Sequence, residues 1–372
     1  MKTNLKQIRL YMVFIYPLIN ILICFLSKGD NMNILSTGYC ILIILLSFKI
    51  NKIDKKTIIT IIILSITVLI AGTRETDRIG FVSSLTYSAT ILMFIVYSEK
   101  YIGIDELTIF SDKHEKLFYL VQSLYIFVLL IHVAIYGFVA GWNTYILQGP
   151  YNYPHTLAYF LELMIMVDVY YWIKKKTKLS MVLLIISEGA VFLTAVRTVL
   201  LSTMVVALFV IYKLINKKRF DKLLGIIMLG IMSLCIAYKY GILDSLIAKT
   251  KLALSNSTIT NGRFNIAASS LKALNKKDGI SFINYITGVG MSQLMASNNK
   301  LLYAPIHAHN DIIDVLVCYG IVNLWLYIKY FYKFAKTNLF WICGTIGILV
   351  ISNGLFPYID CIPILIFTRL LL

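Results

Sequence analysis

Apolar stretches of roughly 17 to 25 residues, the length that crosses a hydrocarbon core, recur along the whole of this 372-residue chain. Hydrophobic residues make up 59% of the sequence and charged residues 14%, whereas about a quarter is charged in an ordinary soluble domain. A water-soluble fold could not bury so much apolar surface. We therefore expect residues 1–372 to form one all-α, polytopic transmembrane domain.

The apolar stretches predict about twelve transmembrane helices. They are expected at residues 8–26, 33–48, 57–72, 80–97, 117–140, 155–173, 179–195, 198–215, 222–238, 310–328, 338–353 and 357–371. No small-residue cleavage site follows the first stretch, so we expect it to be a retained helix rather than a removed signal peptide.

Lysine and arginine cluster at every second connection, which orients the chain because basic residues of short loops stay on the cytoplasmic side. The alternate short connections hold only Lys28, Arg74, Arg78 and Arg197. Both termini are therefore expected in the cytoplasm, with a large extracytoplasmic loop at 239–308 between the ninth and tenth helices.

This loop is expected to be a small subdomain of its own. Apolar residues recur at helical spacing in 242–254 and again in 264–274, which predicts amphipathic helices that rest at the membrane surface. A loop of about seventy residues with its own helices is usually functional rather than a linker.

Charge and cysteine content exclude two other classes of protein. The net charge of +17 comes from short basic clusters between apolar segments, so we expect no nucleic-acid partner. The six cysteines lie inside apolar segments, without a CxxC pair or clustered histidines. Neither a disulfide nor a metal site is predicted, and no cofactor is indicated.

Two arginines on the expected outer side are candidates for chemistry. Arg197 lies in a connection so short that it must be a tight hairpin between two spans, and Arg263 opens the second loop helix. Arg197 is equally well interpreted as an arginine that snorkels to the interface, and Arg263 alone is better interpreted as a solvated loop charge.

A histidine pair precedes the tenth span in the sequence His307-Ala308-His309-Asn310-Asp311. The alternative to a catalytic role is a polar helix cap, with Asn310 or Asp311 as the capping residue. We expect His307 to matter less than His309.

Taken together, two arginines and a histidine suit a site that expels a phosphate leaving group. Arginines bind a diphosphate through paired, charge-assisted hydrogen bonds, and a neutral histidine removes a proton near neutral pH. Asp311 and Asp314 are close to one helical turn apart on the tenth span, where they would orient His309, hydrogen-bond a sugar hydroxyl or pair with a nearby cation.

At these residues the sequence resembles the O-antigen polymerase and O-antigen ligase superfamily, which includes the Wzy-type polymerases of surface polysaccharides. Residues 309–316 with 319–322 are similar to the H-N-x-x-L…x-G-I-x-G signature, although Asn323 stands where a second glycine is usual. The other similar stretches are an S-x-R-T/S-like element at 194–198, an S/T-G-R-like element at 261–263, a G-x-G-like stretch at 286–290 and a P-N-x-x-A-like element at 153–158.

The resemblance implies a metal-independent, inverting glycosyltransferase in the bacterial plasma membrane with its site facing outside. It would transfer a growing glycan from polyprenyl diphosphate to a lipid-linked repeat unit, in capsule, exopolysaccharide or O-antigen synthesis. Arg197 and Arg263 would bind the donor diphosphate and His309 would be the general base. Asp311, Asp314, Asn310, Gly262 and His155 are the expected substrate-binding residues. Further partners would be a chain-length regulator and a flippase, besides membrane lipid.

Two other functions stay open. A ligase of the same superfamily would use the same residues and deliver the glycan to another acceptor. A flippase or transporter of the same lipid-linked glycan also fits about twelve spans, although transporters usually place polar groups at the midplane of two related halves.

Overall fold

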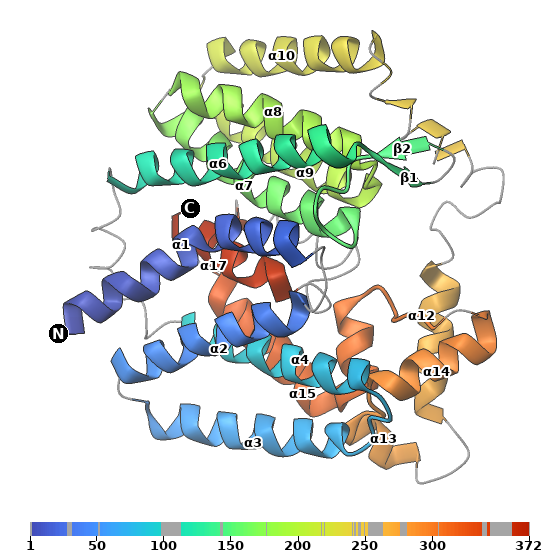
Figure 1. Ribbon diagram of the computed structural model, residues 1–372. Helices are drawn as coiled ribbons and strands as arrows, with labels where there is room; N and C mark the ends of the chain where they lie inside the picture. The colour runs from blue at the N-terminus through green and yellow to red at the C-terminus, as the bar shows by residue number, and fades with distance from the viewer. Residues whose placement is uncertain are drawn as a thin grey trace.

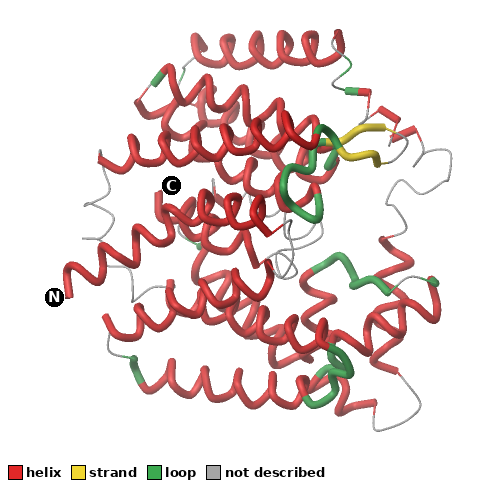
Figure 2. Tube along the Cα trace, viewed as in Figure 1, coloured by secondary structure: helices red, strands yellow, loops and turns green. Residues whose placement is uncertain are grey.

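The computed structural model describes residues 2–27, 32–50, 53–97, 113–141, 144–175, 177–216, 218, 220–239, 241, 243–244, 247–248, 250–251, 263–275, 281–303, 305–336, 341–342 and 359–371. Almost all of them are helical, as the tube in Figure 2 shows, and the strands form one small hairpin. The expectation of an all-α membrane protein is confirmed.

The elements follow one another along the chain as bundle helices, a hairpin, more bundle helices, a cap and two final segments. They are α1 (Lys2–Ser27), α2 (Met32–Ile50), α3 (Lys55–Gly72), α4 (Arg78–Tyr97), α6 (Lys113–Tyr136), β1 (Val139–Gly141), β2 (Thr144–Ile146), α7 (Pro154–Lys175), α8 (Lys178–Thr194), α9 (Arg197–Asn216), α10 (Phe220–Lys239), α12 (Arg263–Lys272), η1 (Ala273–Asn275), α13 (Ser281–Thr287), α14 (Met291–Leu302), α15 (Asp311–Ala335), η3 (Ile359–Cys361) and α17 (Ile362–Leu371).

Six helices of the described residues are long and apolar enough to cross a membrane, namely α1, α3, α4, α6, α9 and α15. Large apolar side chains lie exposed on them, for example Leu26 at 81% and Leu69 at 68%, as lipid-facing surfaces require. The full number of twelve spans and their orientation stay predictions. The span expected at 338–353 lies outside the described residues except for 341–342.

The expected span at 117–140 is wrong at its end. The helix α6 stops at Tyr136, where Gly137 adopts a φ of 72°, a conformation that ends helices and that glycine tolerates. The chain then forms the antiparallel β1–β2 hairpin, with Val139 opposite Ile146.

The helices lie side by side in two groups (Figure 1). In the upper group α7 packs on α8, and α9 packs on α7 and α10. In the lower group α4 packs against α2, α3 and α15, while α1 contacts α6, α2 and α17, so that it joins the two groups.

The expected outer loop is seen in part as a cap. The helices α12, α13 and α14 lie together at the right of the view in Figure 1, beyond the ends of the bundle helices, and pack against α15. The helix predicted over 264–274 is present as α12 and η1, whereas the one predicted over 242–254 lies largely outside the described residues.

Candidate functional site

The helix α15 begins at Asp311 because the residue before it caps the helix. The side-chain oxygen of Asn310 accepts hydrogen bonds from the backbone N–H groups of Ile312 and Ile313, at 3.0 and 3.3 Å. Asparagine is among the best capping residues because its oxygen satisfies N–H groups that have no partner in the helix. Of the two capping residues that the sequence analysis considered, Asn310 is therefore the one that caps the helix.

Asp314 holds the turn in front of that helix. One carboxylate oxygen accepts from the backbone N–H of Ala308 at 2.7 Å, and the other lies 2.9 Å from Nδ1 of His307. The Asp314 side chain is fully buried, so these charge-assisted contacts are protected from water. The geometry supports the orienting role considered for Asp314 and commits both of its oxygens to the turn.

His307 lies directly beside His309, although the sequence analysis expected His307 to matter less. Its Nδ1 is 3.1 Å from the backbone nitrogen of His309, and the two rings have centroids 4.2 Å apart. The carboxylate contact is the stronger of the two on Nδ1, and it favours the tautomer with the proton on that nitrogen. His307 and Asp314 together therefore fix the backbone from which His309 projects.

His309 occupies a conformation and an environment that suit a neutral imidazole. Its φ of 56° lies in the left-handed region, which is uncommon for a residue other than glycine and is frequent at functional sites. Burial, helped by the charges of His307 and Arg263 and opposed by Asp314, lowers the pKa of His309 to about 4. Its Nδ1 is buried and has no hydrogen-bond partner among the residues that the structure describes. The ring is therefore uncharged and able to accept a proton at physiological pH.

Arg263 is the second predicted residue of this cluster. It opens α12, is half-buried, and lies near enough to His309 for its positive charge to lower the pKa of the histidine. The helix α12 packs on α14 and α15, so Arg263 is carried by the same part of the fold as His309. The neighbouring Gly262 lies outside the described residues.

The G-x-G-like stretch packs directly on a break in α15. Val289 and Gly290 donate backbone hydrogen bonds to the carbonyls of Val317 and Cys318, at 2.8 and 3.0 Å. These carbonyls are accessible because Gly320, at φ 80° and ψ 178°, interrupts the helix. A Cβ on Gly288 would lie 2.2 Å from the backbone oxygen of Cys318. The glycine there permits close backbone approach, which brings the cap onto the helix that follows His309.

Glu75 and Arg74, which the sequence analysis did not select, also hold the G-x-G-like stretch in place. Glu75, in the α3–α4 hairpin, accepts from the backbone N–H groups of Met291 and Ser292 at 2.7 and 2.8 Å, and so caps α14. Arg74 donates to the Gly288 carbonyl and to the Asn284 side chain. The adjacent opposite charges of Arg74 and Glu75 are visible in the sequence. Their partners could not be predicted from it, because they lie more than 200 positions away along the chain.

Asn323 and Asp311 tie α15 to its neighbours. Asn323, which departs from the usual glycine, donates to the Tyr319 carbonyl at 2.7 Å beside the helix break and accepts from Thr67 at 3.1 Å. Asp311 is buried and accepts from the Tyr327 hydroxyl at 2.5 Å. Asp311 therefore has at least one partner inside the helix bundle rather than facing only outward.

Arg197 and His155 lie in the upper helical group. Arg197 begins α9 after a tight connection in which Ala195 adopts a φ of 53°, as the short hairpin predicted. His155 is the second residue of α7, and both side chains are half-buried. The structure thus brings His309, Asp314 and Arg263 together, whereas the convergence of Arg197 on them stays a prediction.

Comparison with known proteins supplies one match. Residues 179–328 match a family described as O-antigen ligase, and this segment includes Arg197, Arg263 and His309. No curated protein and no solved structure matches the chain.

Proposed function

We propose that this protein polymerises a surface polysaccharide at the outer face of the bacterial plasma membrane, because residues 179–328 match a family described as O-antigen ligase. The donor is a glycan on polyprenyl diphosphate and the acceptor is a hydroxyl of a lipid-linked repeat unit. The observation that carries this proposal is the neutral, half-buried His309 beside the charge of Arg263, on a turn held by Asp314.

In the proposed reaction His309 removes the proton from the acceptor hydroxyl as that oxygen attacks the anomeric carbon of the donor. The bond between this carbon and the diphosphate oxygen breaks, and the electron pair leaves with the diphosphate. Attack opposite the leaving group inverts the anomeric centre. The scheme assigns no step to a metal ion.

The two arginines stabilise the departing diphosphate in this scheme. Arg263 and Arg197 supply guanidinium groups, whose planar donors match phosphate oxygens and whose charge persists at every physiological pH. Their charge acts on negative charge that develops in the transition state, which is where electrostatic stabilisation is most effective. A diphosphate close to His309 also raises the pKa of the histidine, because an anion favours the imidazolium that forms during proton transfer.

A ligase reaction is the second candidate, favoured by the description of the matching family. It uses the same donor and the same residues, and differs in the acceptor. Capsule, exopolysaccharide and O-antigen remain alternative products of the polymerase reaction. A chain-length regulator and a flippase are proposed as partners.

The decisive experiment supplies purified protein in detergent with lipid-linked repeat units and follows glycan length on a gel. A polymerase lengthens the glycan in this single compartment. A ligase transfers it only when a second acceptor, such as a lipid core, a wall polymer or a protein, is added. Absence of any transfer in detergent, together with movement of the lipid between the leaflets of vesicles, would identify a transporter and refute the proposal.

A further inference from the structure

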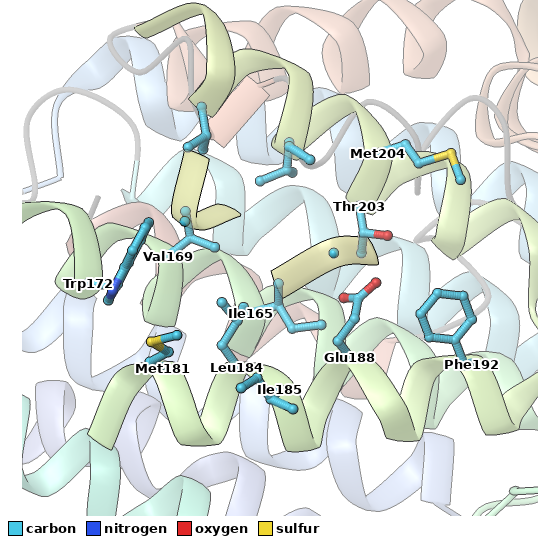
Figure 3. A pocket seen from close by; sticks show the side chains of 15 residues that line it. Ile165, Val169, Trp172, Met181, Leu184, Ile185, Glu188, Phe192, Thr203 and Met204 are labelled. Carbon is cyan, nitrogen blue, oxygen red and sulfur yellow. The ribbon is translucent and has the colours of Figure 1, made fainter. Parts of the chain in front are cut away.

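A cavity of about 430 Å³ lies between α7, α8, α9 and α10, well within the size range of ligand sites. Its walls are largely apolar, with Trp172 towards one end and Phe192 towards the other (Figure 3). The carboxyl of Glu188 points towards Thr203, whose hydroxyl donates a hydrogen bond to the Leu200 carbonyl at 2.9 Å. The other lining side chains are apolar or aromatic, so most of the surface offered to a ligand is that of an apolar slot.

The cavity is continuous with the apolar exterior of the bundle. Met204 and Ile185 line it and are 59% and 40% exposed, so its wall passes into surface that faces lipid. An opening of this kind inside a membrane admits an apolar chain from the bilayer more readily than a polar solute from water.

The position of the cavity relative to Arg197 indicates which hydrocarbon chain it would hold. Arg197 and Met204 are seven residues apart on α9, so they share one face of that helix, and Thr203 lies about 9 Å along the helix from Arg197. Phe192, at the other wall, is in the last turn of α8 just before the tight connection to α9. A lipid whose head group is held at Arg197 therefore has this cavity beside its chain.

We propose that the cavity between α7 and α10 binds the isoprenoid chain of the lipid-linked donor. The proposal rests on the proposed function, because that function places the donor diphosphate at Arg197. The ligand is the unsaturated, branched hydrocarbon chain of the donor. An ordinary phospholipid is not the proposed occupant of the cavity. Glu188 and Thr203 lie in the wall of this cavity, where α8 faces α9.

The test compares donors that carry a long isoprenoid chain with soluble donors that carry two isoprene units, using purified full-length protein. Ala207→Phe fills the cavity, because Ala207 lines it, while Leu208→Phe is the matched control on the neighbouring, 66% exposed position. We expect Ala207→Phe to raise KM about tenfold or more for the long-chain donor and to leave the short-chain donor unchanged. Leu208→Phe is expected to change neither.

A second filling variant protects the test against misfolding of the first. Gly225 lies on the opposite wall, where an added Cβ meets nothing within 4 Å, so Gly225→Leu occupies the same space from α10. Equal effects on both donors, or no effect on either in well-folded variants, would show that the cavity holds only a phospholipid chain and would overturn the inference. Failure of the wild-type protein to elongate any donor would instead remove the proposed function, and the inference with it.

Discussion

The two halves of the proposed site are built in opposite ways. On the side of α12–α15, the side chains of Asp314, Asn310 and Glu75 accept hydrogen bonds from backbone N–H groups and so hold the turn and the cap in one arrangement around His309. On the side of α7–α10, Arg197 begins α9, a helix that lines an apolar cavity with little polar lining. A proton-transfer group needs a defined position within hydrogen-bond reach, whereas a hydrocarbon chain needs only space and apolar contact. The difference suggests that the first half performs the chemistry and the second holds the lipid.

The largest effect is expected from removal of the base. His309→Ala should lower polymerisation about a thousandfold, the usual contribution of a general base, with the protein still inserted and abundant. Arg263→Ala and Arg197→Ala should also abolish long-chain polysaccharide. The measurement is polysaccharide length in cells, with protein quantified in the same membranes. Normal chain length in the His309→Ala strain would eliminate His309 as the base.

A matched pair of glycine substitutions tests the difference in packing between the halves. Gly288→Ala puts a Cβ against the backbone of Cys318 at a positive φ, so we expect it to destabilise the fold by roughly 1–3 kcal/mol. Gly189→Ala on α8, where an added Cβ meets nothing within 4 Å, should be neutral or stabilising. Thermal unfolding of the purified variants measures both. Equal melting temperatures would show that the cap is not held by this close approach.

The smallest effect is expected in the pH dependence. The lowered pKa of His309 keeps the ring neutral above about pH 5, so kcat/KM should be flat through neutrality and fall only as the pH approaches about 4. His307→Asn removes a charge that lowers this pKa and keeps a donor towards Asp314. The acid limb should then move to higher pH, with the neutral-pH rate retained within a few-fold.

His307→Ala is the control for that prediction, because it removes both the charge and the donor. It should shift the acid limb in the same direction and also lower kcat with little change in KM. An unshifted acid limb in both variants would show that His309 is not the titrating group.

Much of the fold was predictable from local signals. The apolar stretches located most described helices to within a few residues, and α15 starts after Asn310, one of the two capping residues that the sequence analysis considered. The end of α6 was mispredicted because the apolar pattern continues past Gly137, where the backbone turns out of the helix. Asp314 was expected to orient His309, to bind a sugar hydroxyl or to pair with a cation, whereas in the structure its carboxylate contacts His307 and the Ala308 N–H, because the turn folds back over the first turn of α15.

By itself the sequence determined that this is a helical membrane protein with its candidate arginines and histidine near helix ends, because hydropathy and the positions of charged residues are read locally along the chain. Only the tertiary structure decided that Glu75 caps α14, that Gly288 meets the break at Gly320, that Asp314 fixes the histidine turn, and that a cavity lies beside α9. Such contacts depend on which surfaces pack together in three dimensions. Neither side-chain periodicity nor composition encodes that choice in any single segment.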